Sequence, residues 1–184
     1  MVQTDRAKKA AFTVLYEAQY LPVLRYARRE VPEHVASDVV AETFTVAWRR
    51  FAEVPEAPLP WLLGVARRII ANQRRGDRRY ERLLQVQQEQ SATPSRDPAD
   101  ALAEQDIVRT AMRQMSAADR EILALIGWDN LGVREAAQVL GIRASTAAVR
   151  LYRARHRLKT HLAKGLSPQP NTPDRSMPVA REIP

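Results

Sequence analysis

The chain has 184 residues, 45% of them hydrophobic, which is enough for one domain or two small ones with packed cores. It contains no cysteine, which excludes disulfides and thiolate metal sites. The formal net charge of +8 and the sequence pI of about 10.4 favour a nucleic acid or another anionic surface as partner. The polar N-terminus lacks the apolar region of a signal peptide, and no stretch reaches the roughly 20 apolar residues of a membrane span. We therefore expect a soluble, cytoplasmic protein without membrane insertion.

The N-terminal part of the chain, residues 4–84, predicts one helical domain. Apolar residues recur there at spacings of three and four, as they do on the buried face of an amphipathic helix. We expect Pro22 to break or kink the first helix, because proline is tolerated best at a first helical position. The segment 54–60, VPEAPLP, predicts a loop since its three prolines disfavour helix, and a third helix is expected to start near Trp61.

The C-terminal part of the chain separates into three segments by composition. Residues 85–100 are rich in Gln, Ser, Pro and Asp, which predicts a flexible linker. Residues 101–164 predict a second helical domain, in which Ser116 and Asp119 are spaced like a capping box. Residues 165–184 contain five prolines and no helical period, which predicts a disordered tail. The predicted fold class is therefore all-α, with two small helical domains joined by a flexible linker.

Residues 132–158 in the second domain carry the most specific pattern, a short helix, a tight turn at Gly141 and a longer helix. Between Ala136 and Lys164 there is no Asp or Glu, whereas seven Lys or Arg occur. Such a helix-turn-helix with a cationic second helix fits the major groove of duplex DNA, where arginine binds guanine or phosphate. The alternative is a solvated basic helix in a bundle, although solvated faces usually carry both signs of charge.

A second basic stretch lies at 65–82, where seven arginines occur with two acidic residues, Asp77 and Glu81. Trp61 precedes this stretch and Tyr80 lies near its end. Arginine beside aromatic rings suits single-stranded nucleic acid, because bases stack on the rings and phosphates pair with the guanidinium groups. Two alternatives stay open: Trp61 belongs to the core, and the arginines are merely solvated.

The remaining candidate features point to no reaction chemistry. Residues 36–51 predict a helix whose outer face is acidic first and basic later, which is ordinary for an exposed helix. The histidines, His34, His156 and His161, are scattered, and we find no nucleophile arrangement, phosphate-binding loop or dinucleotide-binding glycine pattern. We therefore expect no catalytic residues, no metal site and no cofactor, and a protein that is not an enzyme.

Four segments follow one another along about residues 8–162: FTVLYEAQYLPVLRYARR, DVVAETFTVAWRRF, PWLLGVARRIIANQRR, and DREILALIGWDNLGVREAAQVLG with TAAVRLYRARHRL. In this order and spacing they resemble the opening helices, the polymerase-docking helix, the minus-10 segment and the minus-35 domain of one family. That family is the extracytoplasmic-function (ECF) group of bacterial RNA polymerase sigma factors. No single segment is decisive, but the four together are specific. The family's middle domain is missing, as expected for this group.

The resemblance implies an alternative sigma factor that binds core RNA polymerase and directs promoter recognition, promoter melting and transcription initiation. It implies a sigma region 2-like domain at 4–84, the linker at 85–100 and a sigma region 4-like helix-turn-helix domain at 101–164. The implied partners are core RNA polymerase, at its β′ clamp helices and β flap, and promoter DNA, both duplex and single-stranded. Many relatives also bind an anti-sigma factor, and no residue here decides whether this chain does.

The resemblance also implies three sets of contact residues. The core polymerase set comprises Asp38, Glu42, Thr43, Trp48 and Arg49. The minus-10 set comprises Trp61, Arg67, Arg68, Asn72, Arg74, Arg75, Arg78 and Arg79. The minus-35 set comprises Arg143, Ser145, Thr146, Arg150, Arg153 and Arg157.

Four positions depart from the usual family pattern, so the promoter preference of better-known relatives cannot be transferred to this chain. Ala41 stands where Gln is usual, Arg68 stands for Asn, and Asn72 stands for Asp. Arg143 occupies the place where a Ser usually begins the second helix of the helix-turn-helix, so we expect Ser145 to cap that helix instead.

Three other functions are weighed against a sigma factor. A conventional helix-turn-helix regulator would leave residues 36–51 and 65–82 without a role, and it is expected to be a dimer because two half-sites are usually read. A sigma-like polymerase adaptor without promoter-melting activity stays open because of the departures at Arg68 and Asn72. An enzyme acting on nucleic acid would need metal-binding carboxylates or a nucleophile near a basic cleft, and the sequence supplies neither.

Overall fold

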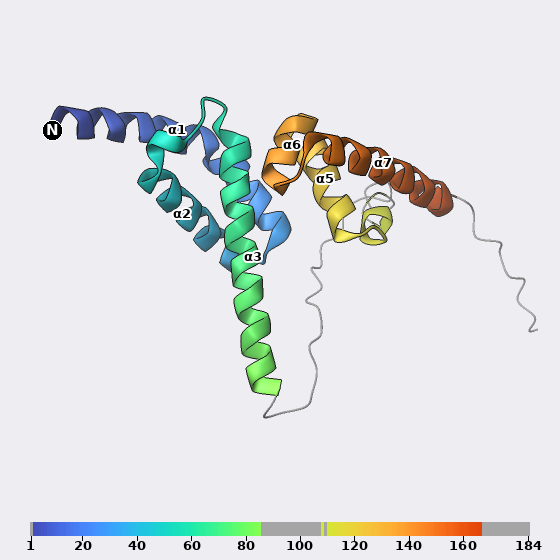
Figure 1. The fold of residues 1–184 in the computed structure, drawn as a ribbon. Coiled ribbons are helices and arrows are strands. Elements are labelled where there is room, and N and C mark those ends of the chain that lie inside the picture. The colour runs from blue at the N-terminus through green and yellow to red at the C-terminus, as the bar shows by residue number, and fades with distance from the viewer. Residues whose placement is uncertain (1, 86–107, 109, 167–184) are drawn as a thin grey trace, which may run out of the picture.

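The structure is a computed structural model that describes residues 2–85, 108 and 110–166. Regular secondary structure in these ranges is helical, without strands, which confirms the all-α fold class (Figure 1). The predicted linker at 85–100 and the predicted tail at 165–184 lie outside the described residues, apart from their first one or two positions, which are helical. Within the described ranges, no helix is long and apolar enough to cross a membrane.

The N-terminal module, residues 2–85, consists of long helices that pack against one another. Helix α1 spans Val2–Glu30, α2 spans Glu33–Arg49, η1 is a short 3-10 turn at Phe51–Glu53, and α3 spans Pro58–Gln85. The apolar stripes predicted from the three- and four-residue spacing meet between these helices. The fully buried side chains there include Val23, Tyr26, Val39, Leu62 and Leu63.

Two proline positions differ from the prediction. Helix α1 runs unbroken through Pro22. Proline removes one N–H donor, and the carbonyl four residues earlier belongs to the exposed Ala18, where water can replace that donor. Helix α3 begins at Pro58 rather than near Trp61. The N–H groups in the first turn of a helix have no acceptor within the helix, so Pro58 and Pro60, which lack an N–H, remove no hydrogen bond there.

The C-terminal module, residues 110–166, contains the predicted helix-turn-helix. After a helical turn at 110–113, α5 spans Ala117–Gly127, α6 spans Val133–Leu140 and α7 spans Ala144–Leu166. Helix α5 packs against both α6 and α7, so that the helix-turn-helix has a third helix behind it. Gly141 follows α6 with a φ of +66°, a left-handed conformation that glycine adopts without steric cost, which confirms the tight turn.

The predicted capping box at the start of α5 forms only in part. The Ser116 hydroxyl accepts a hydrogen bond from the Asp119 N–H at 3.2 Å, and so caps the helix. The Asp119 carboxylate does not return to Ser116, because it binds the Arg157 guanidinium of α7. This second hydrogen bond of a capping box is present at the start of α6 instead, where the Glu135 carboxylate accepts from the Gly132 N–H at 2.6 Å.

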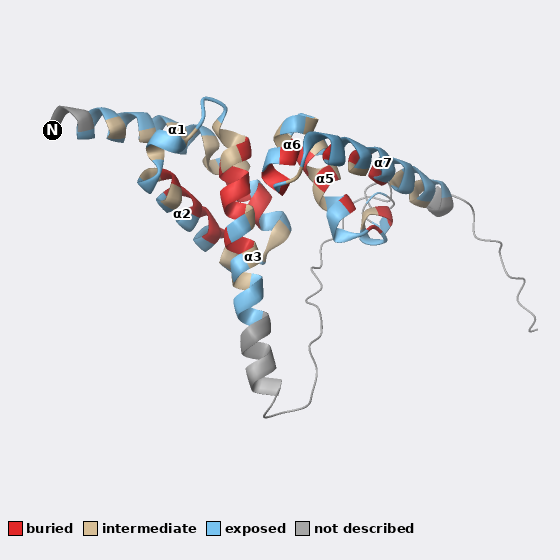
Figure 2. Ribbon diagram, in the orientation of Figure 1, coloured by how far each residue is buried: buried red, intermediate tan, exposed pale blue. Residues whose placement is uncertain are grey.

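The two modules pack directly against each other through α3 and α6 (Figure 1). Buried apolar residues of both modules belong to one hydrophobic core that continues across this junction (Figure 2). The sequence did not predict this contact. The polar segment at 85–100 was interpreted as a flexible linker, which led us to expect two domains with separate cores.

Candidate nucleic-acid and polymerase surfaces

The outer face of α7 forms a basic hollow beside the start of α5. Its volume is about 470 Å³, and it is lined by Asp119, Ser145, Thr146, Val149, Arg150, Arg153 and Arg157. The inner face of α7 buries Ala147, Leu151 and Ala154, which turns the arginines outward. The structure thus brings together five of the six residues predicted to contact the minus-35 element, all except Arg143.

The start of α7 differs from the prediction in one respect. The helix begins at Ala144, and Arg143 immediately precedes it with its carbonyl accepting from the Ala147 N–H at 3.0 Å. Ser145 therefore lies inside the first turn, and the expectation that it caps the helix is wrong. As a result the Ser145 side chain faces the hollow.

Asp119 is an acidic residue at the edge of this basic hollow. Its side chain is only 5% exposed, and it accepts a hydrogen bond from Arg157, whose side chain is 54% exposed. A buried carboxylate that binds one guanidinium nitrogen fixes the position of the arginine, while its other N–H groups can still donate to a ligand. Sequence reasoning gave Asp119 only a role in capping, because its partner lies 38 residues further along the chain.

Val149 lines the hollow and was not among the predicted contact residues. Its side chain stays exposed although it is apolar and lies between Ser145 and Arg153 on the same helical face. The four-residue spacing from Ser145 was a signal that could have identified it. An exposed apolar side chain among arginines is suited to an apolar group of a ligand, such as a thymine methyl.

The predicted minus-10 residues lie along α3 in two different environments. Arg68, Asn72 and Arg75 share one exposed face, and Arg75 donates a hydrogen bond to the side-chain oxygen Oδ1 of Asn72. Trp61 is half-buried and packs against the core at the start of the helix.

Arg74 points away from the exposed face of α3 and donates to Glu30, with 3.3 Å between its Nη2 and a carboxylate oxygen. The side chains of the other two predicted residues, Arg78 and Arg79, lie outside the part that the structure describes.

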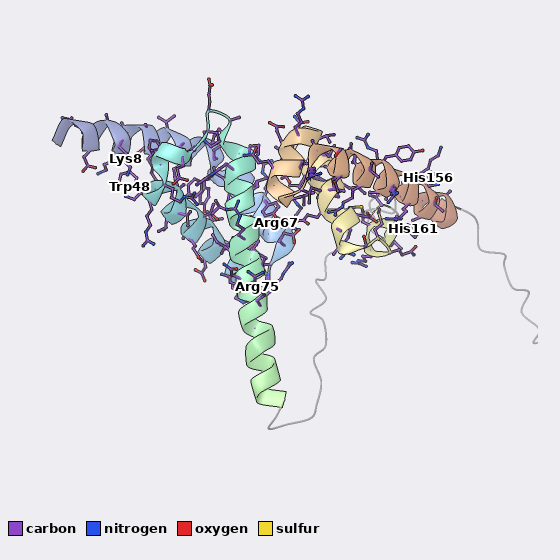
Figure 3. The ribbon with its side chains drawn as sticks, viewed as in Figure 1. Lys8, Trp48, Arg67, Arg75, His156 and His161 are labelled. Atoms are coloured by element: carbon purple, nitrogen blue, oxygen red, sulfur yellow. The ribbon has the colours of Figure 1, made fainter. Side chains whose placement is uncertain are left out.

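Arg67 differs from the rest of the minus-10 set because it lies at the junction of the modules (Figure 3). Its Nε and Nη2 donate to the two carboxylate oxygens of Glu121 of α5, at 2.6 and 3.2 Å. This hydrogen bonding raises the pKa of Arg67 above its ordinary value. Burial, with a smaller contribution from Glu121, raises the pKa of the neighbouring Tyr26 far above its usual range, so that this phenol stays neutral.

The predicted polymerase face lies on α2. Asp38, Glu42 and Arg49 are exposed, and none of the ion pairs recorded among the described residues uses them. Trp48 is half-buried, with its ring 5.1 Å from the Phe12 ring and under the Lys8 ammonium at 4.4 Å (Figure 3).

Thr43 is the one member of the polymerase set that cannot reach a partner in this structure. Its side chain is fully buried, and its hydroxyl donates to the Val39 carbonyl at 2.7 Å. The cause is the position of α2, which is covered by α1 on one side and α3 on the other, so that more than one stripe of the helix is buried. The prediction that Thr43 contacts polymerase is therefore corrected.

The all-α fold, the tight glycine turn and the basic face of α7 define a protein of the helix-turn-helix class. Residues 105–158 match the family described as Sigma-70, region 4. Over 142 residues the chain is 28% identical to the RNA polymerase sigma-E factor of Streptomyces coelicolor, covering 76% of this chain and 79% of that protein. These two matches confirm the resemblance described above: the chain is similar to an RNA polymerase sigma-E factor, and its residues 105–158 are similar to sigma region 4.

Solved structures show the same fold. The sigma factor RpoE of Bartonella quintana, solved in complex with the anti-sigma factor NepR, aligns with a TM-score of 0.61 at 24% identity, over 81% of this chain and 96% of that one. CnrH, solved in complex with the cytosolic domain of CnrY, aligns with a TM-score of 0.59 at 24% identity, over 85% of this chain and 90% of that one.

Proposed function

We propose that this sigma factor binds core RNA polymerase through α2, reads a duplex minus-35 element through α7 and captures the minus-10 element through α3. The observation that carries the proposal is the basic hollow of α7, in which three arginines converge on one side of a helix-turn-helix. Arginines spaced along one face can bind guanine edges and phosphates together. No acidic residue occurs on α7, so nothing on that helix repels the phosphate backbone.

The exposed face of α3 supports the minus-10 part of the proposal. Arg68 and Arg75 can neutralise phosphates of a single strand, and Asn72 between them can bind a base edge. Unstacking a base costs a few kcal/mol, which stacking of about 1–3 kcal/mol per base and phosphate pairing can offset. The α3 face needs to supply only a modest net binding free energy for promoter melting. The reason is that α3 and α7 lie on one chain, so that binding of DNA by one surface raises the effective concentration of DNA at the other.

The mixed-charge face of α2 supports the polymerase part of the proposal. Asp38, Glu42 and Arg49 are exposed, so that their charges are available to another protein. The aromatic cluster behind them, formed by Phe12, Trp48 and their neighbours, holds α2 against α1 and so presents these charges on a rigid helix. An anti-sigma factor is a further partner that we propose by analogy with the Bartonella quintana structure.

The proposal is tested with the purified chain and core RNA polymerase. We expect the two to co-elute in gel filtration at low salt, and run-off transcription from a promoter library to yield initiation that depends on this chain. Affinity for promoter DNA should fall roughly a thousandfold between 50 and 200 mM salt if about six phosphates are neutralised.

Failure to co-elute with core polymerase in the absence of any inhibitor would refute the proposal. Co-elution without run-off product would instead support the polymerase adaptor that does not melt promoters. A salt-independent DNA affinity would contradict the phosphate contacts assigned to α7 and α3.

A further inference from the structure

One of the three arginines in the basic hollow differs from the other two. Arg150, Arg153 and Arg157 lie along the same face of α7, because they are spaced by three and four residues. Arg157 binds the carboxylate of Asp119 on α5 through its Nη1, which leaves Nε and Nη2 to donate to a ligand. None of the ion pairs recorded among the described residues uses Arg150 or Arg153. The hollow therefore combines two arginines that can adjust to a ligand with one that is held in place.

The pair between Asp119 and Arg157 also differs from the other ion pairs of the C-terminal module. Two further carboxylates of that module bind arginines of the N-terminal module, in the pairs Arg67–Glu121 and Arg29–Asp129. Among the described residues, Asp119 is the acid that binds an arginine of α7, and it is also the acid that lines the hollow. A carboxylate by itself repels a polyanion, so a benefit for DNA binding must act through the arginine that it holds.

Asp119 is a rigid anchor for that arginine. Its side chain is almost fully buried, and its backbone N–H donates to the Ser116 hydroxyl in the first turn of α5. The N-terminus of a helix also favours a negative charge. Helix α5 buries Ile122 and Leu125 completely and packs against α7. The carboxylate is therefore fixed relative to α7, and it holds Arg157 in one orientation.

Holding Arg157 in this way has two opposite effects on DNA binding. The carboxylate partly neutralises the guanidinium, which weakens its attraction to the phosphate backbone of any sequence. A side chain that is already ordered loses less freedom on binding, which strengthens the contact about two- to tenfold where a base edge supplies a matching acceptor. The first effect acts on all DNA, whereas the second acts on DNA with that acceptor. Both effects therefore increase the preference for one sequence over others.

We propose that Asp119 is a positioning residue that makes the α7 hollow selective, because it holds Arg157 in the orientation for one base edge and lowers its attraction to phosphates elsewhere. Since Asp119 is almost fully buried, its effect is transmitted by Arg157 rather than by contact with DNA. The identity of the selected DNA as a minus-35 element rests on the proposed function, whereas the held arginine is a property of the free chain.

A double-mutant cycle separates this role from a merely structural one. Asp119→Ala removes the anchor and leaves the backbone N–H that Ser116 accepts, whereas Asp119→Asn keeps an oxygen that can accept from Arg157 but has no charge. Arg157→Ala and the double variant complete the cycle. Glu56→Ala, in the exposed loop before α3, changes the net charge by the same amount as Asp119→Ala and is the matched control.

The affinities to compare are those of the full chain for two labelled duplexes, measured by fluorescence anisotropy. One duplex is selected from a random pool by wild type, and the other has the same composition in scrambled order. We expect Asp119→Ala to bind the scrambled duplex about threefold more tightly, which is the size expected for a partly exposed ion pair. The ratio of selected to scrambled affinity should fall about fivefold in this variant, because Arg157 must then be ordered by the DNA.

The other variants show whether this loss of selectivity acts through Arg157. Asp119→Asn should show the same gain on the scrambled duplex but keep most of the affinity ratio, because its side-chain oxygen still accepts from Arg157. In the Arg157→Ala background, Asp119→Ala should leave the ratio unchanged, since no arginine remains to be held. Without DNA, the nitrogen–proton heteronuclear NOE of the Arg157 Nε–Hε group should be high in wild type and in Asp119→Asn, and it should fall in Asp119→Ala.

An unchanged affinity ratio in Asp119→Ala, with the variant folded by circular dichroism, would overturn the proposal. So would an equal loss of the ratio in the Arg157→Ala background, which would make Asp119 a structural residue, or an Asp119→Asn affinity for the scrambled duplex no higher than that of Glu56→Ala. If wild type selects no duplex from the pool, the proposed function fails as well. A selective wild type whose Asp119 variants keep the wild-type ratio overturns the role of Asp119 alone.

Discussion

Single residues decide whether the arginines of this protein are available to DNA. Arg150 and Arg153 line the hollow and take part in none of the ion pairs recorded among the described residues, whereas Arg67 and Arg74 are bound to carboxylates of the same chain. The sequence alone predicts all four as DNA contacts, because an arginine on a helix face carries no sign of a distant partner. Glu121 lies 54 residues from Arg67 and Glu30 lies 44 residues from Arg74, beyond the reach of any local pattern.

Arg150 is the residue whose removal should most directly weaken minus-35 recognition. It lines the hollow between Thr146 and Arg153, so it can bind a base edge, and loss of such a contact costs about 1–3 kcal/mol. We expect Arg150→Ala to reduce affinity for a selected minus-35 duplex about fivefold or more and to leave co-elution with polymerase intact. Arg155→Ala removes an exposed arginine of α7 that does not line the hollow, and an equal loss in that variant would contradict the assignment.

Asp129 should make stability depend on pH. Burial raises the pKa of Asp129 above its ordinary value, more than the neighbouring Arg29 lowers it. The folded state therefore favours the protonated acid, and this favourable contribution is present below the ordinary pKa and is lost as pH rises through the raised one. We expect the melting temperature of wild type to fall relative to that of Asp129→Asn as pH rises from about 4 to 7, because only the wild-type side chain loses its proton. A thermal melt of both proteins at several pH values checks this, and a difference that does not change with pH would contradict it.

At the level of elements, the periodic helices could be predicted and their ends could not. The inner stripe of α7 follows from the spacing of Ala147, Leu151 and Ala154, and the hollow on its opposite face follows from the same period. The ends depend on which backbone groups find partners, which is why α1 continues through Pro22 and α3 begins at Pro58. Thr43 could not be placed either, since its burial comes from two helices that flank α2 rather than from α2 itself.

The turn of the helix-turn-helix should be sensitive to the loss of Gly141. Its φ of +66° places a side chain in a strained conformation, at a cost of about 1–2 kcal/mol for an L-residue. We expect Gly141→Ala to lower the free energy of unfolding by about that amount. Gly127→Ala, at the end of α5 with open space around the added methyl, should be neutral or slightly stabilising. Denaturant titration of both variants checks the contrast, which fails if the two changes have the same sign.

At the level of the whole molecule, the described residues form three separate charged or polar surfaces. The α7 hollow is basic, the α2 face has charges of both signs, and the α3 face combines arginines with an amide. Composition and periodicity along the chain predicted the basic faces of α7 and α3, whereas the α2 face was assigned a role only through the resemblance to sigma factors. The relative placement of the three surfaces could not be predicted, because it depends on the close approach of α3 and α6 at Gly64.

This separation predicts a double variant that affects one partner only. Asp38→Ala with Arg49→Ala should weaken binding to core polymerase about tenfold or more, if each contact contributes on the order of 1 kcal/mol. DNA binding by the free chain should stay unchanged, since net charge is conserved and α7 is untouched. Arg28→Ala with Glu33→Ala removes another exposed acid and arginine and is the control. If both double variants lose polymerase binding to the same degree, the α2 face is not the docking surface.

The tryptophans of the chain are distributed so that each half carries its own intrinsic optical reporter. Trp48 packs against Phe12 of α1 and Trp61 against the core, both in the first half, whereas the indole of Trp128, directly before Asp129, is 58% exposed in the second. A collisional quencher such as acrylamide should therefore reach Trp128 first. When the Arg29–Asp129 pair separates, the emission of this indole should change without any dye on the protein.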